Sequence, residues 1–133
     1  DSVASRGLGD VYKRQEHVGK TLQTNAATDA LVSKAVLEGM SGMFLGEKGS
    51  RTDPLANPLK ADYTGFPRLY INAGSAETLL DNAQDLERIA KAAGVNVTLS
   101  VVDGMQHVFP FLAGRAPEAD DELRRIAQWF KGA

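Results

Sequence analysis

The stretch LYINAGSAETLLDNAQDLERIAKAAGVNVTLSVVDGMQH, residues 69–107, decides the fold. Its first apolar run, 69–73, is short and predicts a buried strand. An apolar stripe through 79–93, with Gly94 placed for a left-handed C-cap, predicts a helix. Residues 95–102 are β-branched with alternating polar residues and predict a second strand. Strand, crossover helix and strand in this order form a right-handed parallel unit, so the expected fold class is α/β.

A further helix is predicted ahead of this unit. Between residues 29 and 44 the apolar side chains recur at steps of three and four, which is typical of an amphipathic helix. Its apolar face would include Val36 and Met43. Asp29 or Thr28 is available as the N-cap, because both side chains can accept from a free backbone N–H.

The remaining chain divides into a loop and a last helix. Glycine and proline interrupt any regular pattern from 46 to 67, because proline lacks a donor and restricts its predecessor. A last helix is predicted to open at Pro117, since proline suits the first helical turn. We expect residues 16–133 to belong to one domain, with a helix and loop at 29–67 and the last strands and helices at 68–133.

Residues 1–15 fit poorly with the rest of the chain, since they show neither the helical nor the strand period. The run DVYKRQ, residues 10–15, resembles the in-frame translation of the mosaic-end adapter used in transposon-based sequencing libraries. Residues 1–15 are therefore predicted to be a non-native leader. A disordered native N-terminus is the alternative.

Composition and charge exclude several classes of function. The 133 residues carry a net charge of −2, with Lys and Arg scattered, so no nucleic-acid partner is expected. No apolar run approaches the roughly 18 residues of a membrane-spanning helix, and we expect a cytoplasmic protein without a membrane span. The absence of cysteine excludes thiolate metal sites, and two histidines are too few for a histidine-rich metal cage. We expect neither metal nor cofactor, and chemistry carried by oxygen and imidazole.

Two polar residues follow the predicted strands where function collects in α/β sheets. Glu77 lies four residues past the first strand and His107 five past the second, so parallel neighbours would bring both to one sheet edge. A carboxylate beside one imidazole nitrogen fixes the tautomer and leaves the other nitrogen to take a proton from a nucleophile. The alternative is that both are ordinary solvated residues. His17 has no such context and is expected at the surface.

Four motifs carry a family resemblance. They are DPLANPL at 53–59, GSAETLLD at 74–81, AGVNVTL at 93–99 and GMQHVF at 104–109. In this order they resemble the C-terminal portion of the hormone-sensitive-lipase family of α/β-hydrolases, the bacterial carboxylesterases, over roughly residues 20–131. The resemblance implies a serine esterase with a small-molecule ester substrate and the triad order Ser, Asp or Glu, then His. His107 matches the family's catalytic histidine.

The resemblance leaves the acid of the triad to be chosen. Many family members have Asp where this chain has Ala76, and alanine cannot orient a histidine. Members that resemble this chain use the neighbouring Glu, so the acid role is assigned to Glu77. Asp81 is the alternative acid, although the first turn of a helix also suits it to a structural role at the positive end of the helix dipole.

The nucleophile of such an enzyme has no match in this chain. No G-x-S-x-G occurs, and the nearest string, GMSGM at 39–43, lies within a predicted helix rather than after a strand. Ser41 is therefore not expected to be a nucleophile elbow. The nucleophile and the oxyanion hole are expected upstream of this chain.

The resemblance also indicates substrate contacts. It places residues 29–67 in the family's cap region, where Met40 and Phe44 are candidates to line an acyl pocket. Core packing is the alternative for these two residues. Phe109, the last residue of the GMQHVF motif, is the third candidate contact.

The leading hypothesis is a carboxylic-ester hydrolase in which His107 is the general acid/base and Glu77 its orienting acid, with the chain inactive on its own. A non-catalytic α/β module that binds a small molecule or a partner at the same sheet edge is the alternative. A flavodoxin-like domain lacks support, because the chain has no glycine-rich phosphate loop.

Overall fold

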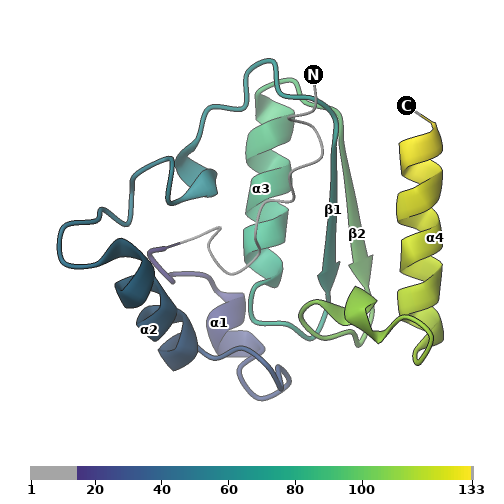
Figure 1. Ribbon diagram of the computed structural model, residues 1–133, viewed down its shortest axis with the longest axis horizontal. Helices are drawn as coiled ribbons and strands as arrows, with labels where there is room; N and C mark the ends of the chain where they lie inside the picture. Colours follow the sequence, from purple (N-terminus) through teal and green to yellow (C-terminus); the bar gives the residue numbers. More distant parts are fainter. Residues whose placement is uncertain (1–14, 133) are drawn as a thin grey trace.

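The computed structural model describes residues 15–132 (Figure 1). In chain order the elements are α1 (Thr21–Thr24), α2 (Lys34–Leu45), the 3-10 helix η3 (Pro58–Lys60), β1 (Leu69–Gly74), α3 (Leu80–Ala92), β2 (Val97–Val102), the 3-10 helix η4 (Phe109–Leu112) and α4 (Pro117–Lys131). The predicted leader, 1–15, lies outside the described residues except for Gln15, which is fully buried.

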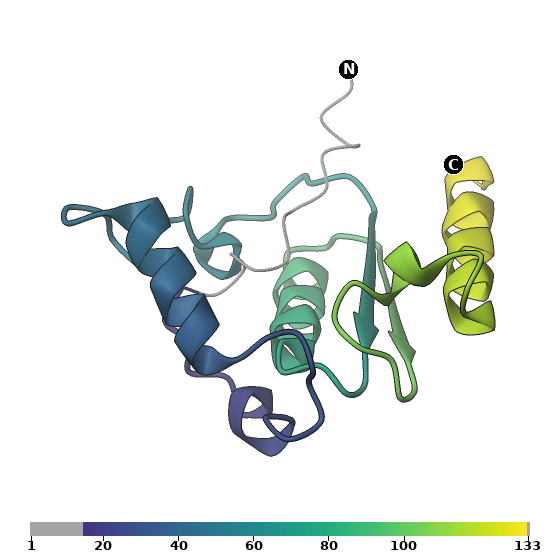
Figure 2. The ribbon, with the colours of Figure 1, turned by 60° about the horizontal axis from the view of Figure 1, so that its bottom comes forward.

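The two strands form the predicted parallel unit. β1 pairs with β2 in a register that places Leu69 opposite Val97 and Gly74 opposite Val102. α3 connects them, and Figures 1 and 2 show α3 and α4 on opposite sides of the strands. The α/β fold class is therefore confirmed, with the carboxyl ends of β1 and β2 side by side.

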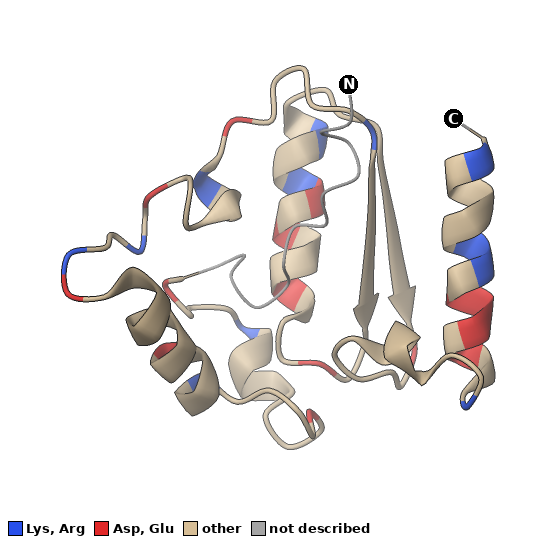
Figure 3. Ribbon diagram, viewed as in Figure 1, with Lys and Arg blue, Asp and Glu red and all other residues tan. Residues whose placement is uncertain are grey.

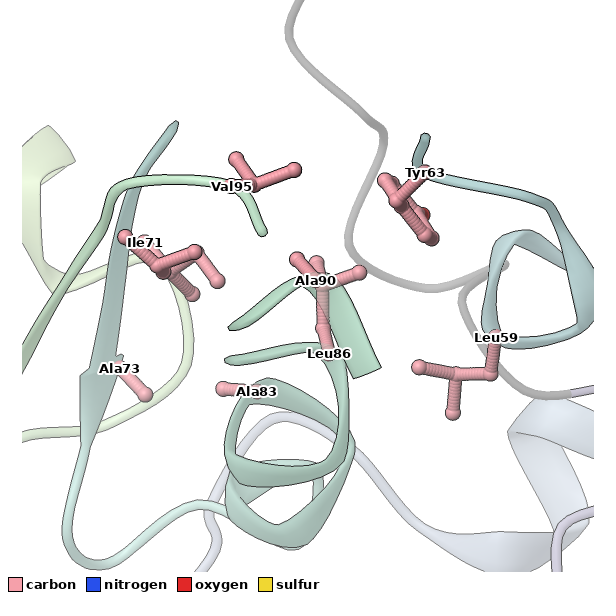
Figure 4. Packing of buried hydrophobic residues seen from close by; sticks show 9 residues of the cluster. Leu59, Tyr63, Ile71, Ala73, Ala83, Leu86, Ala90 and Val95 are labelled. Atoms are coloured by element: carbon pink, nitrogen blue, oxygen red, sulfur yellow. The ribbon is translucent and has the colours of Figure 1, made fainter. Parts of the chain in front are cut away.

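The core lies between the sheet, α3 and the segment around η3. Figure 4 shows side chains of β1 facing α3, with Leu59 and Tyr63 on the opposite side of that helix. The buried cluster consists of Leu59, Tyr63, Ile71, Ala73, Ala83, Leu86, Ala90, Val95 and Val97. Full burial of a side chain such as Leu86 contributes about 1.5–3 kcal/mol. α3 is thereby fixed against β1, which anchors the loop after Gly74.

α4 covers the other face of the sheet through a buried polar contact. Glu122 is fully buried and accepts hydrogen bonds from the Tyr70 hydroxyl of β1 and the Ser100 hydroxyl of β2, both at 2.9 Å. Acidic side chains lie in the first turn of α4 and basic ones toward its end, as the helix dipole favours (Figure 3). The apolar Leu123 of this helix is 43% exposed.

Helix α2 differs from the prediction in its start and in its buried face. It begins at Lys34, where the Ser33 side chain accepts from the Val36 backbone N. Asp29, one of the two predicted N-cap residues, instead accepts hydrogen bonds from Thr78. Leu37 and Ser41 are the buried residues of α2, whereas Val36 and Met43 are 50% and 81% exposed. The predicted apolar face was therefore wrong, because three- and four-residue spacing fits several stripes of one helix.

The other predicted elements exist with small boundary shifts. The predicted helix 79–93 is α3, and the predicted strand 95–102 begins at Val97. The last helix begins at Pro117 as predicted, while α1, η3 and η4 were not foreseen. No helix between residues 15 and 132 is both long and apolar enough to cross a membrane.

Candidate active site

The loops after β1 and β2 leave the sheet in contact with each other. The Ser75 backbone N donates to the Val102 carbonyl at 2.9 Å, and the Ala76 backbone N donates to the Met105 carbonyl at 3.1 Å. Gly74 makes this approach possible, since a Cβ atom there would lie 2.0 Å from the Met105 carbonyl oxygen. A side chain at residue 74 would force the loops apart.

Glu77 and His107 meet where these loops touch. The Glu77 Oε1 atom lies 3.6 Å from His107 Nδ1, and the two residues are 5% and 6% exposed. Glu77 Oε2 accepts from the Gly74 backbone N at 2.9 Å, which fixes the carboxylate. A separation of 3.6 Å is longer than a hydrogen bond and within the distance of an ion pair. The predicted pair is therefore brought together, with Nδ1 on the carboxylate side.

Backbone strain lies immediately beside His107. Val108 has φ 52° and ψ 29°, the left-handed helical region, where a β-branched residue is a rare outlier. Such strain persists where the surrounding structure enforces it and is commonly found at functional sites. The turn at Val108 directs the chain into η4, whose first residue, Phe109, is buried.

A pocket of about 140 Å³ opens beside Glu77. It is lined by Asn72, Ala73, Glu77, Val108, Phe109, Pro110 and Phe111. Phe109, a predicted substrate contact, thus lines the same pocket as Glu77. Met40 and Phe44 belong to α2 and are not among the lining residues, and Phe44 is 56% exposed.

Asp81, the alternative acid, is held on the α1 side of α3. Its Oδ2 atom accepts from the Thr21 backbone N at 3.2 Å. A Cβ atom on Gly19 would lie 2.4 Å from the same oxygen, so the chain passes very close to this carboxylate. Asp81 also occupies the first turn of α3, where the helix dipole stabilises a negative charge.

His17 is buried, so the prediction that it lies at the surface was wrong. It is 4% exposed, with Nδ1 3.2 Å from Glu38 Oε1 and Nε2 3.2 Å from the Ser41 hydroxyl. The residues that contact it are far away in the sequence, which is why no local pattern indicated burial. Arg51 Nη1 also lies 3.4 Å from His17 Nδ1.

His17 lies between the Ser41 hydroxyl and the Glu38 carboxylate, as the histidine of a triad does, but Ser41 lacks the surroundings of a nucleophile. Ser41 lies within α2 and donates its hydroxyl hydrogen to the Gln15 side-chain oxygen. Backbone N–H groups in the middle of a helix are bonded to carbonyls one turn earlier, so they cannot form an oxyanion hole. The prediction that Ser41 is not a nucleophile elbow agrees with this geometry.

Three polar residues make contacts at the two loops of the site, and these contacts were not predicted from the sequence. We call residues 75–78, after β1, the acid loop and residues 103–107, after β2, the histidine loop. Asn25 and Asp29 bond to the acid loop, and Gln106 of the histidine loop bonds to Thr28. Partial burial alone would raise the pKa of Asp29, but hydrogen bonds from Thr78, Val32 and Leu31 outweigh it and lower that pKa. Their partners lie tens of residues away, so no sequence signal could have identified them.

Metal ligands do not gather at this site or elsewhere in the part of the chain that the structure describes. No group of three or more His, Asp and Glu side chains is arranged to hold a metal ion there.

Comparison with known proteins gives the family. The model of a protein family described as alpha/beta hydrolase fold matches residues 7–111 of this chain. An acetyl-hydrolase from Streptomyces hygroscopicus is 37% identical over 100 residues, which cover 75% of this chain and 33% of that protein. An esterase from Acinetobacter venetianus is 31% identical over 110 residues, covering 83% of this chain and 36% of that protein. The chain thus spans about a third of the length of the curated relatives it matches.

Solved structures agree with these relatives. An esterase from the bacterial hormone-sensitive lipase family superposes with a TM-score of 0.85 at 39% identity, covering 88% of this chain and 39% of that one. A hormone-sensitive lipase from a metagenome library gives a TM-score of 0.86 at 31% identity, covering 90% and 41%. The chain therefore belongs to the hormone-sensitive-lipase family of α/β-hydrolases.

Proposed function

We propose that the whole protein, of which this chain forms a part, is a carboxylic-ester hydrolase that works by serine acyl transfer. The observation that carries the proposal is the Glu77–His107 pair, buried at the touching ends of two parallel strands with 3.6 Å between Oε1 and Nδ1. The esterase relatives support the reaction class. In this proposal the serine nucleophile and the oxyanion hole lie outside the chain, which has no G-x-S-x-G.

In the proposed mechanism His107 moves the proton and Glu77 holds the imidazole in position. Glu77 accepts from Nδ1–H, which leaves Nε2 as the base. His107 Nε2 removes the serine hydroxyl proton while the serine oxygen bonds to the ester carbonyl carbon, and the same proton then passes to the departing alcohol. Water, deprotonated in the same way, cleaves the acyl-enzyme and regenerates the serine. Glu77 stays ionised and stabilises the imidazolium formed in both halves.

The proposed substrate is a small-molecule ester whose acyl or alcohol group packs on Phe109. Phe109 and Val108 give the pocket beside Glu77 an apolar wall, which suits a hydrocarbon group. We further propose that residues 29–67 belong to the cap region. Contacts of Met40 and Phe44 with the acyl group stay a prediction.

A matched pair of histidine variants in the whole protein tests this proposal. His107→Ala is expected to abolish hydrolysis of a short-chain p-nitrophenyl ester. His17→Ala removes the other histidine, which is also buried beside a glutamate, and should lower the melting temperature without lowering kcat of the folded enzyme. Near-normal turnover by His107→Ala would refute the proposal and favour a binding module on the same fold.

A further inference from the structure

One short segment, residues 25–30, contacts both loops of the proposed active site. It comes directly after α1 and lies about 50 residues from the acid loop in the sequence. Its backbone is closed on itself, since the N–H groups of Thr28 and Asp29 both donate to the Asn25 carbonyl at 3.0 and 2.9 Å. Because these hydrogen bonds already fix the backbone of residues 25–29, the segment is a rigid support for the loops that it contacts.

Asn25 binds the acid loop on both sides of Ala76. Its Nδ2 atom donates to the Ser75 carbonyl at 3.0 Å and to the Glu77 carbonyl at 2.9 Å. Both amide hydrogens are thereby used on the loop that carries the proposed acid. The Asn25 Oδ1 atom accepts from the Thr24 hydroxyl at 3.0 Å, which sets the orientation of the amide.

The neighbours of Asn25 bind the rest of the acid loop. The Thr28 hydroxyl donates to the Ala76 carbonyl at 3.0 Å. The Asp29 Oδ2 atom accepts from the Thr78 backbone N at 2.7 Å and from its hydroxyl at 2.9 Å. Every residue from 75 to 78 is therefore bonded to a side chain of this segment.

The histidine loop is tied to the same segment by Gln106, the residue before His107. Gln106 Oε1 accepts from the Ala30 backbone N at 2.8 Å, and Nε2 donates to the Thr28 carbonyl at 2.8 Å. This two-point contact fixes the Gln106 side chain against residues 28–30. The relative position of Glu77 and His107 is thus set by this shared support together with the direct backbone contacts between the two loops.

We propose that Asn25 is a positioning residue that aligns Glu77 with His107. This inference rests on the proposed function of the pair. Asn25 is not one of the residues that line the pocket, and its amide acts through the two carbonyl groups that it holds. Loss of its donors removes the two hydrogen bonds that hold the Ser75 and Glu77 carbonyls. We expect Glu77 to shift relative to the imidazole, which lies 3.6 Å from its carboxylate, although Thr28 and Asp29 still hold residues 76 and 78.

Asn25→Ala and Asn25→Asp test the proposal in the whole enzyme, since both remove the amide donors and the second keeps the size. We expect kcat to fall by about 10- to 100-fold, as a misplacement of roughly 1 Å does, with little change in KM. We also expect the acidic limb of the kcat/KM profile to move to lower pH, because a carboxylate aligned with an imidazole favours its protonated form.

Asn57→Ala is the matched control. Asn57 is fully buried and its amide also bridges segments, donating to the Arg51 carbonyl at 2.8 Å and to Glu16 Oε2 at 2.6 Å. Neither of these hydrogen bonds involves a residue of the acid or histidine loop. We expect a lower melting temperature with an unmoved acidic limb, which is the signature of a purely structural role.

The outcomes separate this inference from the proposed function. An unchanged kcat in both Asn25 variants, or a reduced kcat with an unmoved acidic limb, overturns the positioning role. The His107→Ala enzyme is measured alongside, and only its retained activity would overturn the proposed function itself. All rates are taken well below each variant's melting temperature, so unfolded protein does not contribute.

Discussion

Gly74 and Met105 approach each other so closely that the strand end carrying the acid loop rests on the backbone of the histidine loop. A Cβ atom on Gly74 would lie 2.0 Å from the Met105 carbonyl oxygen and 2.9 Å from the Gln106 carbonyl oxygen. Both contacts are with backbone atoms, which cannot rotate away as a side chain does. The two loops of the proposed active site can therefore approach each other this closely only with glycine at position 74.

Gly74→Ala is expected to destabilise the protein by about 1–3 kcal/mol, the usual cost of overpacking, and to lower kcat by separating Glu77 from His107. Gly39→Ala is the control, because a Cβ atom there meets nothing within 4 Å inside helix α2. It should stabilise the protein by up to about 1 kcal/mol. Urea denaturation of the whole protein measures both, and equal stability of the two variants would contradict the close approach.

Glu122→Leu is expected to cost about 2–4 kcal/mol, because the Tyr70 and Ser100 hydroxyls lose their buried acceptor. Asp121→Ala, one residue earlier, removes an exposed ion pair with Arg124 and should change stability by less than about 1 kcal/mol. Thermal or chemical unfolding compares them. A Glu122→Leu variant as stable as Asp121→Ala would show that this contact does not hold α4 on the sheet.

Acid is expected to weaken the contact between Asp29 and the acid loop. Hydrogen bonds lower the pKa of Asp29 in the folded protein. Its stabilising contribution is therefore complete above the unfolded pKa of about 3.9 and is lost as the pH falls through the lower folded pKa. Asp29→Asn should cost about 1–3 kcal/mol at pH 7 and flatten the fall in unfolding free energy below about pH 4. Thr78→Val, which removes one donor, should flatten it partly; an unaltered pH slope in Asp29→Asn would contradict the assignment.

The chain on its own is expected to show no esterase activity, because it offers no G-x-S-x-G to the Glu77–His107 pair. Hydrolysis of p-nitrophenyl acetate by the purified 133-residue chain is the assay, with the whole protein as positive control. Turnover that disappears in His107→Ala would show that a serine within this chain serves as nucleophile.

The fold was predictable where local sequence determines structure. The run 69–102 combines a short apolar strand, a helix with an apolar stripe and a β-branched strand, and each element agrees with its own periodicity. Helix α2 shows where periodicity fails. Its buried face is chosen by what packs on Leu37 and Ser41, and spacing alone cannot distinguish that stripe from the one through Val36 and Met43.

The site was predictable to the extent that parallel topology fixes it. The strand ends bring Glu77 and His107 together once β1 and β2 are neighbours. The positions of these two residues after their strands, and the parallel connection between the strands, were therefore sufficient to predict the pair. Asn25 and Asp29 were not predictable, because their partners lie about 50 residues away and their side chains follow no period. Burial of His17 depends in the same way on distant segments.

The central claim is that Glu77, rather than Asp81, orients His107. The most direct measurement is kcat/KM of Glu77→Gln and Asp81→Asn in the whole enzyme on one ester, with thermal melts to correct for unfolded protein. Glu77→Gln keeps the shape but removes the charge that stabilises the imidazolium, and we expect a loss of about 10⁴-fold, or roughly 5 kcal/mol of transition-state stabilisation. Asp81→Asn should lose stability of about 0.3–1 kcal/mol and little activity. A crippled Asp81→Asn beside a nearly normal Glu77→Gln would contradict the claim and move the acid role to Asp81.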